Sequence, residues 1–279
     1  MEDTPDIKTI VVGHGESARF LAFGDDSKFM NTLVYAFAIV DRVNHKRAAK
    51  RIRGIKDKFR ISPEIPIHCR ILFRKEQREK HGLAHMSDDD ARSLVRMVIV
   101  EMNKIPVALR FAFMNIPNVD MGAEGRITLN HVSDGSAIDL PLKCDSKGFL
   151  GLLMQSCFAV SPDGREGPPA SECQIYTSED STRITFIGKE RKRADKWYTG
   201  FSDIGAKENT VFGIEPIILK NSDSQMMGVA DIFAYLCSHA MEKECRDSFF
   251  REQLGKVKFW SRATFLPNQA LHPIAGGGG

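Results

Sequence analysis

The chain of 279 residues is 42% hydrophobic and 27% charged, with a formal net charge of +3, as expected of a soluble globular protein. No apolar run approaches the roughly 20 residues that span a bilayer, and the acidic first ten residues lack the apolar core of a secretory signal. Six scattered cysteines without a C-x-x-C pair argue against a disulfide framework and a zinc cluster. We therefore expect a cytoplasmic protein with no membrane partner, folded as a single domain over residues 1–275 and ending in a linker remnant at 276–279.

The first predicted elements are a hairpin and a basic helix. Residues 19–23 are typical of a short strand that ends at Gly24, followed by a polar connection. Residues 32–40, TLVYAFAIV, lack charge and are rich in β-branched and aromatic side chains, so we expect a buried strand antiparallel to the first. Residues 44–59 then show a narrow apolar stripe on an otherwise basic helix.

A second helix begins at an unusually clear signal. Ser87 is a good N-cap, and Asp90 occupies the position of the acid in a capping box. This helix should end before Pro106, and residues 107–114 then favour a strand. Residues 115–145 are rich in Gly, Asn and Asp, so we expect an insertion that forms a loop or a small hairpin.

The second half of the chain continues the alternation. Residues 147–160 favour a buried helix and residues 173–178 a strand, while residues 183–187 are either its hairpin partner or part of a polar loop. Residues 210–219 favour a strand that leads directly into a long helix over 221–239. This alternation predicts an α/β fold with a mixed sheet flanked by helices.

Asp231 is an unusual residue for the helix over 221–239. Val229, Ile232 and Phe233 lie on the face that should pack on the core. The neighbours of Asp231 on the helix surface are apolar, aromatic or small: Met227, Gly228, Ala234 and Tyr235. An ionised carboxylate in such surroundings must be paired, hydrogen-bonded or bound to a metal. The alternative is a partly exposed acid near a helix start, favoured by the helix dipole.

Acidic residues also follow two predicted strands. Asp25 and Asp26 follow the first strand, Glu179 and Asp180 follow the strand over 173–178, and Asp231 lies on the last long helix. If these elements converge at one sheet edge, the carboxylates would form a site for a hard cation such as Mg²⁺ or Mn²⁺. Two such ions can activate water and stabilise the leaving oxygen of a phosphodiester. The alternative is that these are ordinary strand-end and loop acids.

Three segments are densely basic: residues 42–60, 70–80 and 189–196. Such runs are usually solvated helix faces. Three of them in one chain also raise the chance of a phosphate-backbone partner. The residues expected to contact nucleic acid in these runs are Arg47, Lys50, Arg51, Arg53, Lys189, Arg191, Lys192 and Arg193.

Three patches of the chain resemble motifs of an uncharacterised family called domain of unknown function 3800. Residues 25–27, DDS, resemble its D-E-S-G opening, and residues 64–68, EIPIH, loosely resemble its E-x-H segment. Ser222 followed by residues 228–235, GVADIFAY, is similar to its closing serine segment and Q-x-A-D-[LI]-x-A-Y. The resemblance spans about residues 18–245, and A-D-I-F-A-Y is its most specific part.

The resemblance implies an RNase H-like fold with a metal-dependent, nuclease-type acidic site. By position, Asp25 would be the metal ligand on the first strand and Asp231 the ligand on the last helix. Asp180 would be the strand-end acid between them, with Glu179 as its substitute, and Asp26 matches the family's glutamate.

The same resemblance assigns a role to His68, which would touch a scissile phosphate or carry a proton. The chain departs from the family pattern at three positions, because Asp26 replaces a glutamate, Lys28 the opening glycine and Gly228 a glutamine. Lys28 would add a positive charge beside the site, which could neutralise a carboxylate or contact a phosphate.

Two functions follow from these observations. The first is a Mg²⁺- or Mn²⁺-dependent nuclease, or other phosphodiester hydrolase, acting on DNA or RNA. The second is a catalytically degenerate RNase H-like protein that binds nucleic acid or a protein partner, a homodimer included. The resemblance alone suggests a setting in phage defence or mobile elements.

Overall fold

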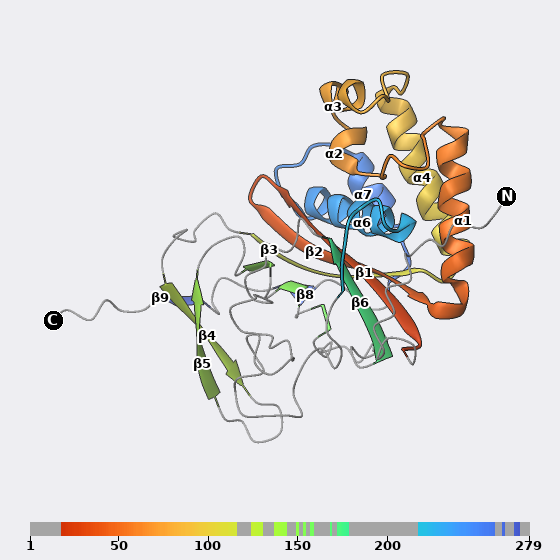
Figure 1. The fold of residues 1–279 in the computed structure, drawn as a ribbon. Coiled ribbons are helices and arrows are strands. Elements are labelled where there is room, and N and C mark those ends of the chain that lie inside the picture. Colours follow the sequence, from red (N-terminus) through yellow and green to blue (C-terminus); the bar gives the residue numbers. More distant parts are fainter. Residues whose placement is uncertain are drawn as a thin grey trace.

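The computed structural model describes residues 18–115, 124–130, 137–143, 149–150, 153–154, 157–158, 168, 172–178, 217–259, 264–265 and 271–273. These residues form a six-stranded mixed sheet with helices on one face, and a second sheet of three strands (Figure 1). The predicted α/β class is therefore confirmed. In this part of the chain, no helix has the length and apolar character needed to cross a membrane.

The centre of the main sheet is an antiparallel hairpin. β1 (Phe20–Phe29) and β2 (Thr32–Asp41) pair without interruption along their whole length. Their turn has two residues, and Met30 adopts a positive φ of 48° there. β2 also pairs antiparallel with β3 (Ala108–Asn115), so the expected hairpin and the expected third strand are both confirmed.

β1 is longer than its composition predicts. We expected the strand to end at Gly24, but its ladder with β2 continues through Asp25 and Asp26 to Phe29. The polar stretch DDSK has a low strand propensity. However, β2 is strongly apolar, is buried as a strand and offers these residues a complete row of backbone partners. Pairing with β2 therefore decides the local conformation, and both acids lie within the sheet rather than after it.

Parallel strands extend the sheet beyond the hairpin. β6 (Cys173–Ser178) pairs parallel with β1, β7 (Ile217–Leu219) pairs parallel with β6, and β8 (Thr264–Phe265) pairs parallel with β3. The resulting order is β7-β6-β1-β2-β3-β8. The strand predicted over 173–178 has those bounds, and the strand predicted over 210–219 is present in its described part.

The predicted insertion near residues 115–145 contains a small hairpin. β4 (Glu124–Asn130) and β5 (Ala137–Lys143) pair antiparallel, and β9 (Leu271–Pro273) adds a third strand next to β4. Figure 1 shows this sheet on the side of the main sheet that lies away from the helices.

The face of the main sheet opposite the helices is also buried. Cys157 Sγ donates a hydrogen bond to the carbonyl of Tyr35 on β2, with a separation of 3.4 Å. The ring of Phe158 packs edge-on against Phe37, with centroids 5.0 Å apart. Of the helix expected over 147–160, residues 149–150 and 153–154 are helical, and its remaining residues apart from 157–158 lie outside the described part, as does the expected segment 183–187.

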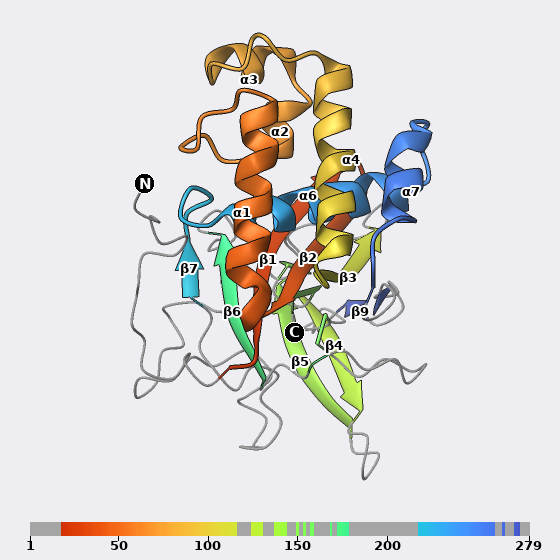
Figure 2. The same ribbon diagram turned by 90° about the vertical axis from the view of Figure 1, so that its right-hand side faces the viewer.

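The helical layer covers the other face. Its elements are α1 (Arg42–Lys58), α2 (Cys69–Leu72), α3 (Lys75–Lys80), α4 (Asp88–Lys104), α6 (Gln225–Met241) and α7 (Ser248–Leu254). Figure 2 shows α6 running behind α1 and α4, between them and the strands. α6 packs directly on β1 and β2.

Local capping explains where two of these helices begin. The capping box of α4 is present as predicted, since Ser87 Oγ accepts the N–H of Asp90 at 3.1 Å and Asp90 Oδ2 accepts the N–H of Ser87 at 2.8 Å. α6 begins after Ser224, whose Oγ accepts the N–H of Met226 at 3.2 Å.

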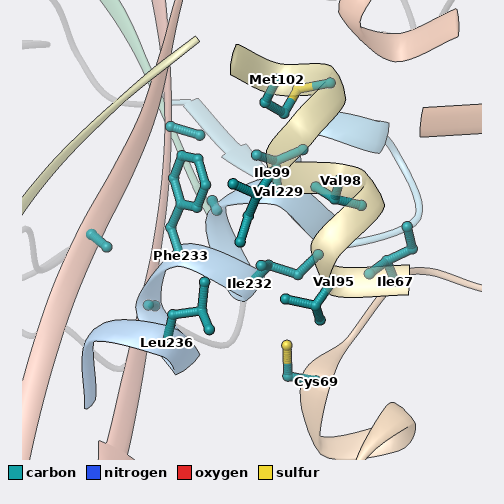
Figure 3. Close-up of a cluster of buried hydrophobic side chains, with 14 of the residues drawn as sticks. Ile67, Cys69, Val95, Val98, Ile99, Met102, Val229, Ile232, Phe233 and Leu236 are labelled. Carbon is teal, nitrogen blue, oxygen red and sulfur yellow. The ribbon is translucent and has the colours of Figure 1, made fainter. Parts of the chain in front are cut away.

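α6 occupies the centre of the core because it is apolar on nearly all sides. Its residues Val229, Ile232, Phe233 and Leu236 pack with Val95, Val98, Ile99 and Met102 of α4 and with Ile67 and Cys69 (Figure 3). The helix predicted over 221–239 is thus confirmed as a core helix.

A row of polar contacts joins α6 to the β1–β2 hairpin. Ser27 Oγ lies 2.9 Å from Ser238 Oγ. Further along, Glu242 Oε2 accepts the N–H of Asn31 at 3.0 Å and the hydroxyl of Thr32 at 3.1 Å. Because side chains alternate along a strand, Asp25 points to the same side as Ser27, toward α6.

Removal of the α4 capping box should destabilise the fold. Ser87→Ala deletes the side-chain acceptor for the Asp90 N–H and the partner of the Asp90 carboxylate. We expect the free energy of unfolding to fall by about 1 kcal/mol. Urea unfolding followed by circular dichroism measures this, with Ser93→Ala on the same helix as a control that should cause no loss. An unchanged Ser87→Ala protein would contradict the capping role.

The buried His239 should make the protein less stable at mildly acidic pH. Its ring stacks on Phe29 with centroids 3.8 Å apart, and burial lowers the pKa of His239 from the ordinary 6.5 to about 4. The unfolded chain therefore binds a proton at this residue between about pH 6.5 and 4, where the folded protein does not. Proton uptake by the unfolded chain therefore leaves the free energy of unfolding unchanged above about pH 6.5 and lowers it progressively as the pH falls from 6.5 toward 4.

Comparison of variants isolates this effect. His239→Gln should show a weaker loss of stability than the wild type between pH 6.5 and 4, whereas His81→Gln, at an exposed histidine, should follow the wild type. Thermal unfolding measured across this pH range tests the prediction, and parallel curves for the wild type and His239→Gln would contradict it.

Candidate active site

Asp231 lies in the middle of α6, is 6% exposed, and is held by the first residue of α2 and the residue before it. Its Oδ1 accepts a hydrogen bond from the backbone N–H of Cys69, with a separation of 2.6 Å. Its Oδ2 lies 2.8 Å from Nδ1 of His68, within ion-pair distance. The acid that appeared misplaced in the sequence is therefore a buried carboxylate with protein partners on both oxygens, and the partly exposed alternative is wrong.

A glycine allows this segment to come so close. Gly228 precedes Asp231 by one helical turn, and a Cβ at position 228 would lie 2.9 Å from Cβ and 3.1 Å from the carbonyl oxygen of Ile67. Both distances are shorter than comfortable carbon contacts, and the carbonyl is part of the backbone. A larger residue here would push Ile67 away and, with it, His68 and Cys69. The glycine at position 228 thus has a packing reason.

Asp25 approaches the same place from β1. It is 5% exposed, and its Oδ1 accepts the N–H of Asp26 at 2.9 Å. The pKa of the Cys69 thiol is raised well above its ordinary value, first by burial and then by the negative charges of Asp231 and Asp25. Both carboxylates therefore act on this thiol through their charge, and Asp231 also through a hydrogen bond. The same shift keeps Cys69 protonated, so it is not a thiolate nucleophile.

One cationic partner of this cluster is present in the described structure. A buried carboxylate is tolerated as an ion when it is hydrogen-bonded or paired with a positive charge. His68 can supply one charge when it is protonated, and its side chain is 31% exposed. His68 therefore has access to solvent, unlike the buried Asp25, Asp231 and Cys69.

Tyr235 and Phe73 form one wall beside the acids. Tyr235 follows Asp231 by one turn of α6, and its ring stacks on Phe73 with centroids 5.3 Å apart. Burial raises the pKa of Tyr235, and the nearby Cys69 and Asp231 raise it further. The phenol therefore remains neutral and can act as a hydrogen-bond donor. The spacing of Asp and Tyr in A-D-I-F-A-Y was the sequence signal for this neighbour.

Asp26 and Lys28 do not join this cluster. Alternation along β1 places them on the opposite face of the strand from Asp25 and Ser27. The predictions that Asp26 is a metal ligand with Asp25 and that Lys28 lies beside the site therefore need correction. The cause is the extension of β1, because a strand separates neighbouring residues to its two faces whereas a loop need not.

Other predicted site residues lie outside the described part of the chain. These are Glu179, Asp180, Lys189, Arg191, Lys192 and Arg193. The described β6 ends at Ser178, and its parallel ladder with β1 ends where Thr177 pairs with Gly24. Ser178 thus follows the last pair of this ladder on β6, as Asp25 does on β1.

The capacity for a metal can be judged from the residues that are described. Among them, no group of three or more His, Cys, Asp or Glu side chains is placed to hold a metal ion. Mg²⁺, however, is often held by only one or two protein carboxylates together with water and substrate phosphates. Asp25 and Asp231 would be the described part of such a site.

The basic segments differ in their surroundings. On α1, Arg47, Lys50 and Arg51 are exposed and Arg53 is half-buried. In the run over 70–80, by contrast, Arg78 is buried and structural, donating to the Leu72 carbonyl and to Asp88 Oδ1, each at 2.6 Å. The exposed α1 residues are therefore the better candidates for contact with a polyanion.

The chain was compared with protein families, curated proteins and solved structures. No protein-family model matches the chain, and neither the curated proteins nor the solved structures give a significant match. The resemblance to domain of unknown function 3800 thus rests on its three motifs and stays a prediction.

Substitution of Gly228 should test how tightly the site is packed. Gly228→Ala places a methyl group 2.9 Å from the Ile67 side chain, and we expect a loss of about 1–3 kcal/mol in the free energy of unfolding. Gly54→Ala on α1 is the matched control, because no atom lies within 4 Å of its Cβ position and alanine favours a helix by about 1 kcal/mol. The urea midpoint of unfolding should fall for Gly228→Ala and rise for Gly54→Ala relative to the wild type. A Gly228→Ala protein as stable as the wild type would contradict the close approach.

Proposed function

We propose that this protein is a metal-dependent phosphodiester hydrolase that acts on nucleic acid, with Asp25, Asp231 and His68 as its catalytic residues. The observation that carries the proposal is the junction of β1, α6 and the start of α2. Asp231, 6% exposed, contacts both Cys69 and the partly exposed His68 there, and Asp25, 5% exposed on the face of β1 toward α6, also acts on the Cys69 thiol through its charge. Packing of a hydrophobic core does not require buried acids, whereas metal-dependent phosphodiester hydrolysis uses carboxylates to hold the metal ions.

The metal would be Mg²⁺ or Mn²⁺, held by Asp25 and Asp231. We propose Asp180, or Glu179 in its place, as the further ligand, since both follow β6, whose ladder with β1 ends at Gly24, one residue before Asp25. When bound, such an ion activates water and stabilises charge on the phosphate oxygens. Carboxylate oxygens are the ligands that such hard divalent cations prefer.

His68 would move the proton. Its Nδ1 lies 2.8 Å from Asp231 Oδ2, and its side chain is 31% exposed. An imidazole beside a carboxylate at a partly exposed position can accept a proton from water and return it to a leaving oxygen. Asp231, anchored by the Cys69 N–H, fixes the orientation of the ring.

The family resemblance supports the same proposal. Its three motifs contribute Asp25, His68 and Asp231, and the structure brings the last two into direct contact. A mixed sheet with β1 at its centre and helices on one face is compatible with the RNase H-like fold that the resemblance implies.

A second candidate function is a degenerate member of this fold that binds nucleic acid or a protein partner without cleaving. One observation favours it. Both oxygens of Asp231 already have protein partners, Cys69 and His68, so a metal would have to share them. This alternative predicts salt-dependent binding without a metal requirement.

Cleavage assays decide between the two. With Mg²⁺ or Mn²⁺, the wild type should cut at least one of single-stranded DNA, duplex DNA and RNA, and EDTA should abolish cutting. Asp25→Asn and Asp231→Asn should each lose nearly all activity. His68→Gln should lose about 10²–10⁴-fold as a proton-transfer residue. Asp89→Asn, at an exposed acid on α4, is the matched control and should retain activity.

Two results would contradict the hydrolase proposal. One is cleavage unchanged in Asp25→Asn and Asp231→Asn while both remain folded by circular dichroism. The other is absence of cleavage together with no Mn²⁺ binding at millimolar concentration in isothermal titration, which would favour the non-catalytic alternative.

A further inference from the structure

α1 presents a basic face to solvent. Its buried side is formed by Ala48, Ala49, Ile52 and Ile55, whereas Lys46, Arg47, Lys50, Arg51 and Lys58 are exposed. Asp57 is the acidic residue on the exposed side of this helix. Arg51 Nε lies 3.7 Å from Glu101 Oε2 of α4, so one cation is partly neutralised within the protein. In Figure 2 the whole length of α1 lies at the front of the helical layer.

Gly54 lies in the middle of this basic face. Lys50 precedes it by one turn of the helix and Lys58 follows it by one turn, so both border its position. Gly54 is exposed, and no described atom lies within 4 Å of where its Cβ would be. A glycine in a helix interior is less favourable than alanine. Neither packing nor a left-handed conformation in the described structure requires a glycine here, in contrast to Gly228.

A missing side chain on a charged helix face lets another molecule approach the helix backbone closely. The flanking lysines indicate that this molecule is a polyanion. A membrane surface is a poorer fit, because helices that lie in a bilayer interface present Trp, Phe or Leu, and the exposed face of α1 has only Val43 as an apolar side chain.

We propose that α1 binds the phosphodiester backbone of the nucleic-acid substrate, with its closest approach at Gly54 and with Lys50 and Lys58 on either side. This inference rests on the proposed function and names the surface that would hold its substrate. Contacts from lysines to phosphates fix position without reading bases, so binding through α1 is independent of sequence.

The test measures stability and affinity on the same variants. Gly54→Ala should raise the melting temperature by about 2–4 °C, because it improves helix propensity in open space. It should also weaken binding to a fluorescent oligonucleotide by about fivefold or more, because a methyl group then lies at the closest contact. Lys50→Ala and Lys58→Ala should each reduce the slope of log affinity against log salt by about 0.7–0.9. Binding is measured by anisotropy in EDTA, so cleavage cannot interfere.

Val100→Ala is the matched control. Val100 is 50% exposed on α4, and the change to alanine also improves helix propensity, so stability should rise while affinity stays unchanged. A rise in melting temperature for Gly54→Ala with unchanged affinity would overturn the close approach. Unchanged salt slopes in both lysine variants would overturn α1 as the binding surface, as would binding to anionic phospholipid vesicles but not to any oligonucleotide.

The two proposals fail separately. Normal α1-dependent binding by a wild type that cleaves nothing would remove the hydrolase and leave the inference in place. Metal-dependent cleavage by the wild type, with Gly54→Ala and the lysine variants binding as the wild type does, would keep the hydrolase and remove the inference.

Discussion

The close contact between α6 and the backbone of Ile67 determines the arrangement of the candidate site. Gly228 is what permits it, because a Cβ there would lie 2.9 Å from the Ile67 side chain. Because Ile67 packs this closely on α6, the backbone N–H of Cys69 lies 2.6 Å from one carboxylate oxygen of Asp231, and His68 Nδ1 lies 2.8 Å from the other. A shift of the segment by the width of a methyl group would weaken both contacts together, since hydrogen bonds tolerate only a few tenths of an ångström.

The site is also rigid for reasons that lie outside it. Asp25 is on the central strand of the sheet, fixed by β2 on one side and adjoining the end of the β1–β6 ladder on the other. The Ser27–Ser238 contact and the bonds from Glu242 to the hairpin turn then hold α6 against β1. Both acids are therefore placed by regular secondary structure rather than by loops, which suits a site that must keep buried charges at fixed separation.

Local signals in the sequence were enough to predict much of the fold. The capping box at Ser87, the uncharged strand β2 and the apolar helix α6 each follow from patterns within a few residues. The end of β1 could not be predicted this way, because a polar stretch became a strand only through pairing with β2. Two features of the candidate site also could not be predicted from local patterns. Asp231 was conspicuous in the sequence, but its contact with Cys69 forms only through tertiary packing. Asp26 was expected beside Asp25 in a loop, but within the strand the two side chains lie on opposite faces.

Two helical glycines show why composition alone cannot separate structure from function. Gly228 and Gly54 have the same helix propensity and the same cost relative to alanine. Their surroundings differ, since a Cβ at Gly228 would collide with the protein's own backbone, whereas one at Gly54 would meet no described atom. At Gly228 the loss in helix propensity is offset within the fold, because the close packing there allows Asp231 to contact Cys69 and His68. At Gly54 the same loss has no compensation among the described residues, and a compensating contact from a bound polyanion is the explanation that the flanking lysines support. The same residue type thus has a structural cause at position 228 and, in our proposal, a binding cause at position 54.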